Sequence, residues 1–325
     1  ELSDLLCIPV ASSLKGKGAI GEQAALALGS LGVTSNGRAY EFIAEKADLL
    51  IILGAGFNER TSYLWDSALL SGKKIVQIDN DAEQLEKVFR ADLAVCSDIG
   101  SLLSGLLERL RPLVAGRNSS ETVANEIAQL NGRANGDYEL FKSGFSLAEE
   151  FFSKLARHYP KNAIVFDDNI IFAQNFFSVS NHNHYYPNSG VSSLGHAIPA
   201  AIGAQFVQQR PTFAIIGDGG FQMCCMEIMT AVNYEFALNV VLFNNDTMGL
   251  IRKNQHQHYN DRFIDCDFTN PDFATFAQSF GINHARIENE RDLADLAGRM
   301  DLHNGINLIE IIIDQDAYPN YSSRR

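Results

Sequence analysis

Short apolar segments alternate along the chain with segments whose apolar residues recur at helical spacing. Continuous apolar runs of about four to eight residues, bounded by Gly, Asp or Asn, are typical of strands buried on both faces of a parallel sheet. The pattern predicts strands at residues 5–10, 49–53, 74–79, 93–96, 163–166, 213–216, 238–243 and 306–313, and helices at residues 38–46, 61–70, 99–110, 121–130, 147–159, 169–177, 221–232, 271–280 and 290–300. This alternation indicates an α/β fold with two doubly wound parallel-sheet domains.

The middle of the chain is polar and rich in turn-forming residues. Residues 115–120 and 131–136 are dominated by Gly, Asn, Ser, Ala and Arg, and 325 residues are enough for two domains. We therefore expect a first domain at residues 1–112, a linker at residues 113–145 and a second domain at residues 146–325.

The most specific local pattern follows two of the predicted strands. Gly217-Asp218-Gly219-Gly220 ends the strand at 213–216, and Asn244-Asn245 ends the strand at 238–243. The carboxyl ends of neighbouring parallel strands meet at one edge of the sheet, where ligands bind. A carboxylate and an amide carbonyl at this edge form an oxygen-only site suited to Mg²⁺ beside a phosphate. The helix that follows the glycines would point its free N–H groups at that phosphate.

Composition excludes several other classes of function. The formal net charge of −13 argues against a nucleic-acid surface and against anionic membranes. The sequence contains no apolar stretch of about 18 residues that would span a membrane. The five cysteines form no CxxC pair, so we expect buried thiols in a reducing cytoplasm rather than disulfides or a metal site. Two His-x-His pairs, at 182/184 and 256/258, leave a transition-metal site open as an alternative to polar loop residues.

Several segments together resemble the thiamine diphosphate (ThDP) enzymes. The motif GDG, then residues 220–243 (24 positions), then NN is similar to the cofactor signature of that family. Residues 190–204, GVSSLGHAIPAAIGA, resemble a second family segment, in which a Gly-rich turn precedes a Pro-Ala-Ala helix. The first domain resembles the central, DHS-like nucleotide-binding-type domain of the acetolactate synthase group, through residues 12–20, 28–32, 47–55 and 78–79.

This resemblance implies a role for each motif residue. The side chains of Asp218 and Asn245 and a backbone carbonyl near Thr247 would ligate Mg²⁺, with two diphosphate oxygens and a water completing six positions. Leu194 would be the apolar wedge that bends the cofactor, and the carbonyl of Ser192 would accept a hydrogen bond from its amino group. The remaining cofactor-binding residues implied are Gly217, Gly219 and Gly220 at the diphosphate, and Met248, Gly249 and Leu250 in the turn that covers the active site.

The chain also departs from the family pattern at informative positions. FAD-binding members carry a Gly-Ala-Arg-Phe motif, whereas Gly56 stands at the position of its first Arg and only Arg60 matches the second, which disfavours FAD. Biosynthetic members carry a Trp nine positions after the second Asn, where this chain has Asn254. The Glu that activates ThDP belongs to a pyrimidine-binding domain that we do not find here. We therefore expect a truncated chain, a proteolysed chain or a subunit with a separate partner, with weak binding and poor turnover alone.

The resemblance implies ThDP- and Mg²⁺-dependent decarboxylation of a 2-oxo acid followed by carboligation, with pyruvate to acetolactate as the leading reaction. Another ThDP-dependent decarboxylase or carboligase is the alternative within the family. A non-catalytic diphosphate- or nucleotide-binding scaffold is the alternative from a different class. The expected partners are a 2-oxo acid and either a homo-oligomer, dimeric or tetrameric, or a pyrimidine-domain protein.

Overall fold

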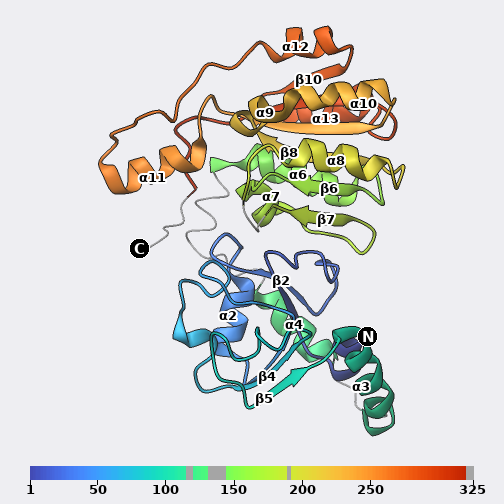
Figure 1. The fold of residues 1–325 in the computed structure, drawn as a ribbon, viewed down its shortest axis with the longest axis vertical. Helices are drawn as coiled ribbons and strands as arrows, with labels where there is room; N and C mark the ends of the chain where they lie inside the picture. Colours follow the sequence, from blue (N-terminus) through green and yellow to red (C-terminus); the bar gives the residue numbers. More distant parts are fainter. Residues whose placement is uncertain (115–119, 131–143, 189–191, 320–325) are drawn as a thin grey trace. The chain divides into compact units, whose positions relative to one another are not determined.

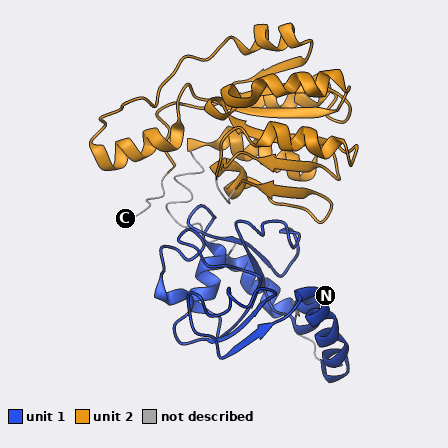
Figure 2. Cartoon of the chain, in the orientation of Figure 1, with its two compact units in different colours: residues 1–135, 323–325 blue, residues 136–322 orange. Residues whose placement is uncertain are grey.

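The computed structural model describes residues 1–114, 120–130, 144–188 and 192–319 (Figure 1). The chain divides into two compact units, Glu1–Asn135 with Ser323–Arg325, and Gly136–Ser322 (Figure 2). Much of the predicted linker, and Gly190 and Val191 of the second motif, lie outside the described residues. In the part of the chain that is described, no helix is both long and apolar enough to cross a membrane.

The first unit contains a small parallel sheet and a separate pair of strands. Strands β3, β4 and β5 pair in that order, all parallel, and β1 pairs with β2, also parallel. The elements are α1 (Leu2–Leu6), β1 (Val10–Ser13), β2 (Ala27–Leu31), α2 (Arg38–Glu45), β3 (Leu49–Leu53), the 3₁₀ turn η1 (Ser67–Leu69), β4 (Lys74–Asp79), β5 (Leu93–Cys96), α3 (Ile99–Val114) and α4 (Ser120–Leu130). The parallel pairing confirms the predicted α/β class.

Two predictions in this unit are wrong. Residues 5–10 are not a strand, because the chain forms α1 and ends it at Cys7 in a left-handed conformation. Residues 61–70 are not an α-helix, because three consecutive residues at 63–65 have positive φ values. The Ser62 hydroxyl accepts the Trp65 N–H at 3.0 Å, and such local side-chain hydrogen bonds compete with helix formation.

The second unit is a single six-stranded sheet with all neighbours parallel. The strand order is β10-β11-β9-β8-β6-β7. The strands are β6 (Ile164–Asp167), β7 (His184–Pro187), β8 (Thr212–Gly217), β9 (Leu238–Asn244), β10 (Asn283–Ile287) and β11 (Ile306–Ile312). The helices are α6 (Ser146–Arg157), α7 (Ile171–Phe176), α8 (Ala197–Gln205), α9 (Asp218–Cys224), α10 (Ile228–Asn233), α11 (Gly249–Tyr259), α12 (Phe273–Phe280) and α13 (Glu290–Arg299), with the 3₁₀ turn η2 (Cys225–Glu227).

Strict alternation along the central strands builds two apolar layers. Odd-numbered residues of β8, such as Phe213 and Ile215, pack in a core with α6, α7 and α13. Even-numbered ones, such as Ala214 and Ile216, pack in a second core with α8, α9, α10 and α12. Because successive side chains of a strand point to opposite faces, helices pack on both faces of this sheet, with α6, α7 and α13 on one and α8, α9, α10 and α12 on the other. Figure 1 labels these helices around the sheet.

The pattern of apolar residues did not predict every element of this unit. The helix expected at 221–232 begins three residues earlier, at Asp218, and is interrupted by η2 before α10. Strands β7 and β10 were not predicted. Both lie at the edges of the sheet, and both carry polar side chains within a short sequence, so neither presents a continuous apolar run.

A buried carboxyl group joins β6 to the edge strand β7. Asp167 is fully buried; one oxygen accepts the Ile170 N–H at 2.6 Å and the other accepts the Tyr185 hydroxyl at 2.7 Å. Burial raises the pKa of Asp167 from 3.8 to about 7. The folded chain therefore retains this proton in a pH range where the unfolded chain has lost it.

This difference predicts a pH dependence of stability. Between pH values of about 4 and 7, raising the pH favours the unfolded state, so the Asp167 contribution to stability is complete below the lower limit and lost above the upper one. In Asp167→Asn the amide can still accept from Ile170 and donate to Tyr185, but it does not titrate. We expect the free energy of unfolding of the variant to rise relative to wild type by up to ~1.4 kcal/mol per pH unit across this window. Urea titrations of both proteins at several pH values measure this difference. A difference in unfolding free energy that stays constant with pH would contradict the raised pKa of Asp167.

Candidate functional site

Three strands end together at one edge of the six-stranded sheet. Strand β8 pairs with β6 on one side and β9 on the other, so Asp168, Asp218 and Asn245 follow neighbouring strand ends. The chain runs from β6 outward to β7 and then returns to β8 on the other side of β6. This reversal of strand order is a topological switch point, the place where open α/β sheets bind ligands.

Asp218 is the central carboxylate of this edge. It begins α9, and only 2% of its surface is exposed. Its Oδ1 accepts the Gly219 N–H at 3.0 Å, and its Oδ2 accepts N–H groups of Asn245 at 3.1 Å, Asp246 at 2.7 Å and the Asn270 side chain at 2.8 Å. All four of these donors are uncharged amides, and burial raises the pKa of Asp218 above its ordinary value despite them.

The loop after β9 is fixed from both sides. Asp246 has a left-handed conformation, with φ of 56°, and its N–H and that of Asn245 both donate to Oδ2 of Asp218. Thr247 is buried and donates its hydroxyl to the Cys266 carbonyl at 2.9 Å, and the Met248 N–H donates to the same carbonyl at 2.8 Å. Helix α11 then begins at Gly249, so the loop enters the helix with little freedom.

Close packing explains two of the motif glycines. A Cβ on Gly219 would lie 2.6 Å from the Met248 sulfur, and a Cβ on Gly220 would lie 2.5 Å from Oδ2 of Asp168. The residues after β9 therefore cover the start of α9. Gly249 is similarly close to Asn245, because an added Cβ would lie 3.0 Å from the Asn245 amide nitrogen.

Asp168 clamps the loop that carries Leu194. Its two oxygens accept the N–H groups of Gly195 at 2.8 Å, His196 at 2.7 Å and Ala197 at 3.1 Å, at the beginning of α8. Gly195 has φ of 83°, and an added Cβ there would lie 3.3 Å from the Cβ of Met223 in α9. The loop is thus held against α9 while the Leu194 side chain stays 38% exposed.

The structure brings most of the predicted site residues into one region. Asp218 and Gly219 contact the loop that holds Asn245 to Gly249, and Gly220 and the loop after Ser192 both lie against Asp168 at the same strand edge. Ser192 has a positive φ of 57°. Gly217 ends β8 and Leu250 lies in the first turn of α11.

Asp168, Asn270 and Glu310 were not predicted as site residues. Asp168 had one signal, a pair of acidic residues at the end of an apolar run. Asn270 lies 52 positions after Asp218, so local sequence gives no indication that the two side chains meet. Glu310 sits within an otherwise apolar run and is 1% exposed, which is itself unusual for a carboxylate.

The oxygen-rich composition of the site fits a hard divalent cation. Buried Asp218 and the side-chain oxygens of Asn244 and Asp246 all lie within hydrogen-bonding distance of one amide group, that of Asn270. Carboxylate and amide oxygens are the ligands that Mg²⁺ prefers. Among the described residues, no three His, Cys, Asp or Glu side chains form a group that could hold a metal ion.

The histidine pairs differ in their surroundings. His184 begins β7, directly after the turn that contains His182. His256 and His258 lie in α11, where residues two apart face different directions, so the two side chains do not share a face of the helix.

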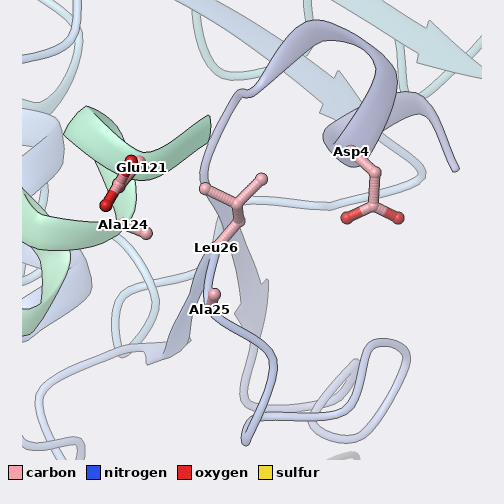
Figure 3. Close-up of a pocket in the computed structure, with 5 residues that line it drawn as sticks. All are labelled: Asp4, Ala25, Leu26, Glu121 and Ala124. Carbon is pink, nitrogen blue, oxygen red and sulfur yellow. The ribbon is translucent and has the colours of Figure 1, made fainter. Parts of the chain in front are cut away.

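A separate hollow lies in the first unit. Asp4 of α1, Ala25, Leu26 and two residues of α4, Glu121 and Ala124, line it (Figure 3). Figure 3 shows Leu26 between α4 on one side and Asp4 on the other, with the two carboxylates apart from each other. None of the motif residues lines this hollow, and it belongs to a different unit from Asp218.

Comparisons with known proteins identify both parts of the chain. Residues 168–311 match the family model "Thiamine pyrophosphate enzyme, C-terminal TPP binding domain", and residues 1–106 match "Thiamine pyrophosphate enzyme, central domain". The first of these matches contains every predicted site residue from Ser192 to Leu250.

The similar curated proteins are acetolactate synthase large subunits. The protein from Cyanidium caldarium is 28% identical over 330 residues, covering 98% of this chain and 55% of the relative. The protein from Lactococcus lactis subsp. lactis (strain IL1403) is 30% identical over 295 residues, covering 89% of this chain and 50% of the relative. A probable acetolactate synthase large subunit from Methanocaldococcus jannaschii is 28% identical over 333 residues, covering 97% of this chain and 54% of the relative. The chain therefore spans about half the length of these relatives.

The clamp at Asp168 makes a testable prediction about Gly220. In Gly220→Ala the new methyl group would overlap a carboxylate that three N–H groups hold in place, so either the helix or the clamp must shift. We expect the variant to lose about 1–3 kcal/mol of unfolding free energy. Hydrogen exchange at residues 195–197 should become faster.

Gly203 in α8 provides the matched control, because nothing lies within 4 Å of the Cβ position there. Gly203→Ala should be neutral or stabilising by up to ~1 kcal/mol. Urea unfolding of the two variants measures the contrast. Equal stability of the two would contradict the close approach of Gly220 to Asp168.

Proposed function

Because this chain belongs to the thiamine pyrophosphate enzymes, we propose that its second unit holds the diphosphate of ThDP through a bound Mg²⁺. Family membership implies ThDP as the cofactor. The side chains of Asp218 and Asn245 and the carbonyl of Thr247 are the proposed protein ligands of the metal. We propose the boundaries 1–112, 113–145 and 146–325 for the central domain, linker and diphosphate-binding domain.

The observation that carries this proposal is the buried Asp218 carboxylate. It lies at the switch point of the sheet and receives hydrogen bonds from uncharged amides alone among the described residues. Burying a carboxylate costs free energy unless a positive charge or full hydrogen bonding compensates it. A divalent cation at Asp218 would offset the desolvation that raises its pKa.

The other site residues have positioning roles in this proposal. Backbone groups at Gly217, Gly219 and Gly220 face the diphosphate, and residues 248–250 cover it. Leu194 is the apolar wedge, and its partial exposure leaves its side chain free to contact the cofactor's rings. The Ser192 carbonyl accepts a hydrogen bond from the cofactor's amino group. Asp168 keeps both residues in place by holding the N–H groups at the start of α8.

We assign to the complete enzyme the decarboxylation of a 2-oxo acid and carboligation of the product, with pyruvate and acetolactate as the leading pair. ThDP supplies a carbon nucleophile and an electron sink for this chemistry. The names of the similar proteins support this choice over other ThDP decarboxylases and carboligases. Asn254, at a position where the biosynthetic members carry Trp, favours the alternatives. The proposed partners are copies of this chain or a protein that supplies a pyrimidine-binding domain.

Metal-dependent cofactor binding tests the proposal directly. We expect calorimetry to detect ThDP binding to the wild-type chain in Mg²⁺ and to lose it when EDTA removes the metal. Asp218→Asn should abolish Mg²⁺-dependent binding, because a neutral amide replaces the charged ligand. Asp301→Asn is the matched control, since Asp301 caps a turn before β11, at the opposite end of the sheet, and should bind like wild type.

Two results would decide against the proposal. Equal ThDP binding by wild type and Asp218→Asn would remove the metal-diphosphate assignment. Binding without turnover of pyruvate or any other 2-oxo acid, even after a relative's pyrimidine-binding domain is added, would favour a non-catalytic diphosphate-binding scaffold. Production of CO₂ and acetolactate under the same conditions would support the enzyme.

A further inference from the structure

The side-chain amide of Asn270 lies at the centre of the oxygen cluster. Its Nδ2 donates to Asp218 Oδ2 at 2.8 Å, to Asp246 Oδ1 at 2.9 Å and to Asn244 Oδ1 at 3.0 Å. Its Oδ1 accepts a hydrogen bond from Gln222 Nε2 at 2.7 Å. The two hydrogens of this NH₂ are shared among the three oxygens, and the amide meets all four neighbours in only one orientation, with its NH₂ toward the oxygens and its carbonyl toward Gln222.

A buried carboxylate fixes the neighbouring amide of Asn244. Glu310 is 1% exposed and accepts hydrogen bonds from Asn244 Nδ2 at 2.7 Å and Arg286 Nη1 at 2.7 Å, with His284 Nε2 at 3.0 Å. Burial alone would raise the pKa of Glu310, but His284, Asn244 and the Arg286 charge hold it below its usual value. An ionised carboxylate only accepts hydrogen bonds, so Asn244 must turn its NH₂ to Glu310 and its oxygen to Asn270.

The register of the sheet places these groups on one face. Glu310 of β11 lies opposite Arg286 of β10 and Leu242 of β9. Asn244 is two residues beyond Leu242, so its side chain points to the same face as those of Leu242 and Glu310. Helix α12 packs on this face, and Asn270 lies two residues before its N-cap, Asp272. The chain of hydrogen bonds therefore crosses from β11 through β9 to the segment before α12 and ends at Asp218, the first residue of α9.

We infer that Glu310, Asn244 and Asn270 form a positioning relay that sets the orientation of Asp218 for the metal. The inference rests on the proposed function, because it assigns these residues to the same Mg²⁺-diphosphate site. Glu310 fixes the amide of Asn244, Asn244 fixes Asn270, and Asn270 holds Oδ2 of Asp218. The other oxygen, Oδ1, accepts only the Gly219 N–H among the described donors and keeps acceptor capacity for a cation.

Glu310→Gln and Asn270→Ala break the relay at its two ends. We expect each to weaken the Mg²⁺ affinity measured calorimetrically at saturating ThDP by about 10–100-fold, as is typical when residues that orient metal ligands are changed. The Mg²⁺ affinity of the double variant should be no lower than that of the weaker-binding single variant, because both changes release the same carboxylate. Additive losses, or affinities equal to wild type, would overturn the relay.

Asn239→Ala is the control for a purely structural effect. Asn239 is buried on β9 and accepts a hydrogen bond from Asn307 on β11 at 2.8 Å, at the opposite end of the same strands. We expect urea unfolding to show a loss of stability in this variant while its Mg²⁺ affinity stays at the wild-type value. A loss of affinity in Asn239→Ala matching that of Glu310→Gln would reduce the relay to a general stability effect.

Hydrogen exchange of the ligand-free chain separates failure of the relay from failure of the proposed function. The N–H groups of Asn245 and Asp246 donate to Asp218, so they should exchange faster in Glu310→Gln and Asn270→Ala than in wild type or Asn239→Ala. Wild type that fails to bind ThDP and Mg²⁺ but shows this exchange pattern would reject the function and retain the relay. Unchanged exchange in the two relay variants, alongside normal wild-type binding, would reject the relay alone.

Discussion

The structure around the candidate site depends on keeping one carboxylate, Asp218, buried at the end of a parallel strand. The register of β8 with β9 brings the Asn245 and Asp246 N–H groups to this side chain. An unpaired charge in this position would cost several kcal/mol. The left-handed bend at Asp246, the pinned Thr247 and the entry into α11 are the local means by which the chain satisfies that requirement. The backbone around Asp218 is thereby fixed by hydrogen bonds of the fold itself.

Local sequence was enough to predict the central strands of the second unit, the turn at Gly217 and the amide pair at Asn244, because each depends on neighbours in the chain. It was not enough for Asp168, whose three donors lie 27, 28 and 29 positions away. The same limit hid Asn270, which meets Asp218 only after α12 packs on the sheet. The roles assigned to residues such as Leu194 and Ser192 depend on family resemblance rather than on any hydrogen bond or contact that could be read from spacing.

Polar side chains account for several of the errors in element prediction. Apolar periodicity reports burial, so it missed the edge strands β7 and β10, which expose polar side chains on part of their surface. It also predicted a helix at 61–70, where Ser62 and Asn58 hydrogen-bond to nearby backbone N–H groups and produce a series of turns. Polar side chains hid the two edge strands, and polar side chains that bond to the backbone replaced the expected helix.

The sheet contains two buried asparagine networks on the same strands, and their end groups distinguish them. The network around Asn239 and Asn307 ends on backbone carbonyls of Thr212, Asp301 and Leu302, which are neutral and fixed by the fold. The network through Asn244 ends instead on the carboxylates of Glu310 and Asp218. Neither amide of this bridge can reverse, because Asn244 directs its NH₂ to Glu310, whereas Asn270 directs its NH₂ to Asp218 and to the Asn244 oxygen. A neutral network stabilises a fold, whereas one that ends on a buried carboxylate also fixes the orientation of that carboxylate, which is the role we propose for it at Asp218.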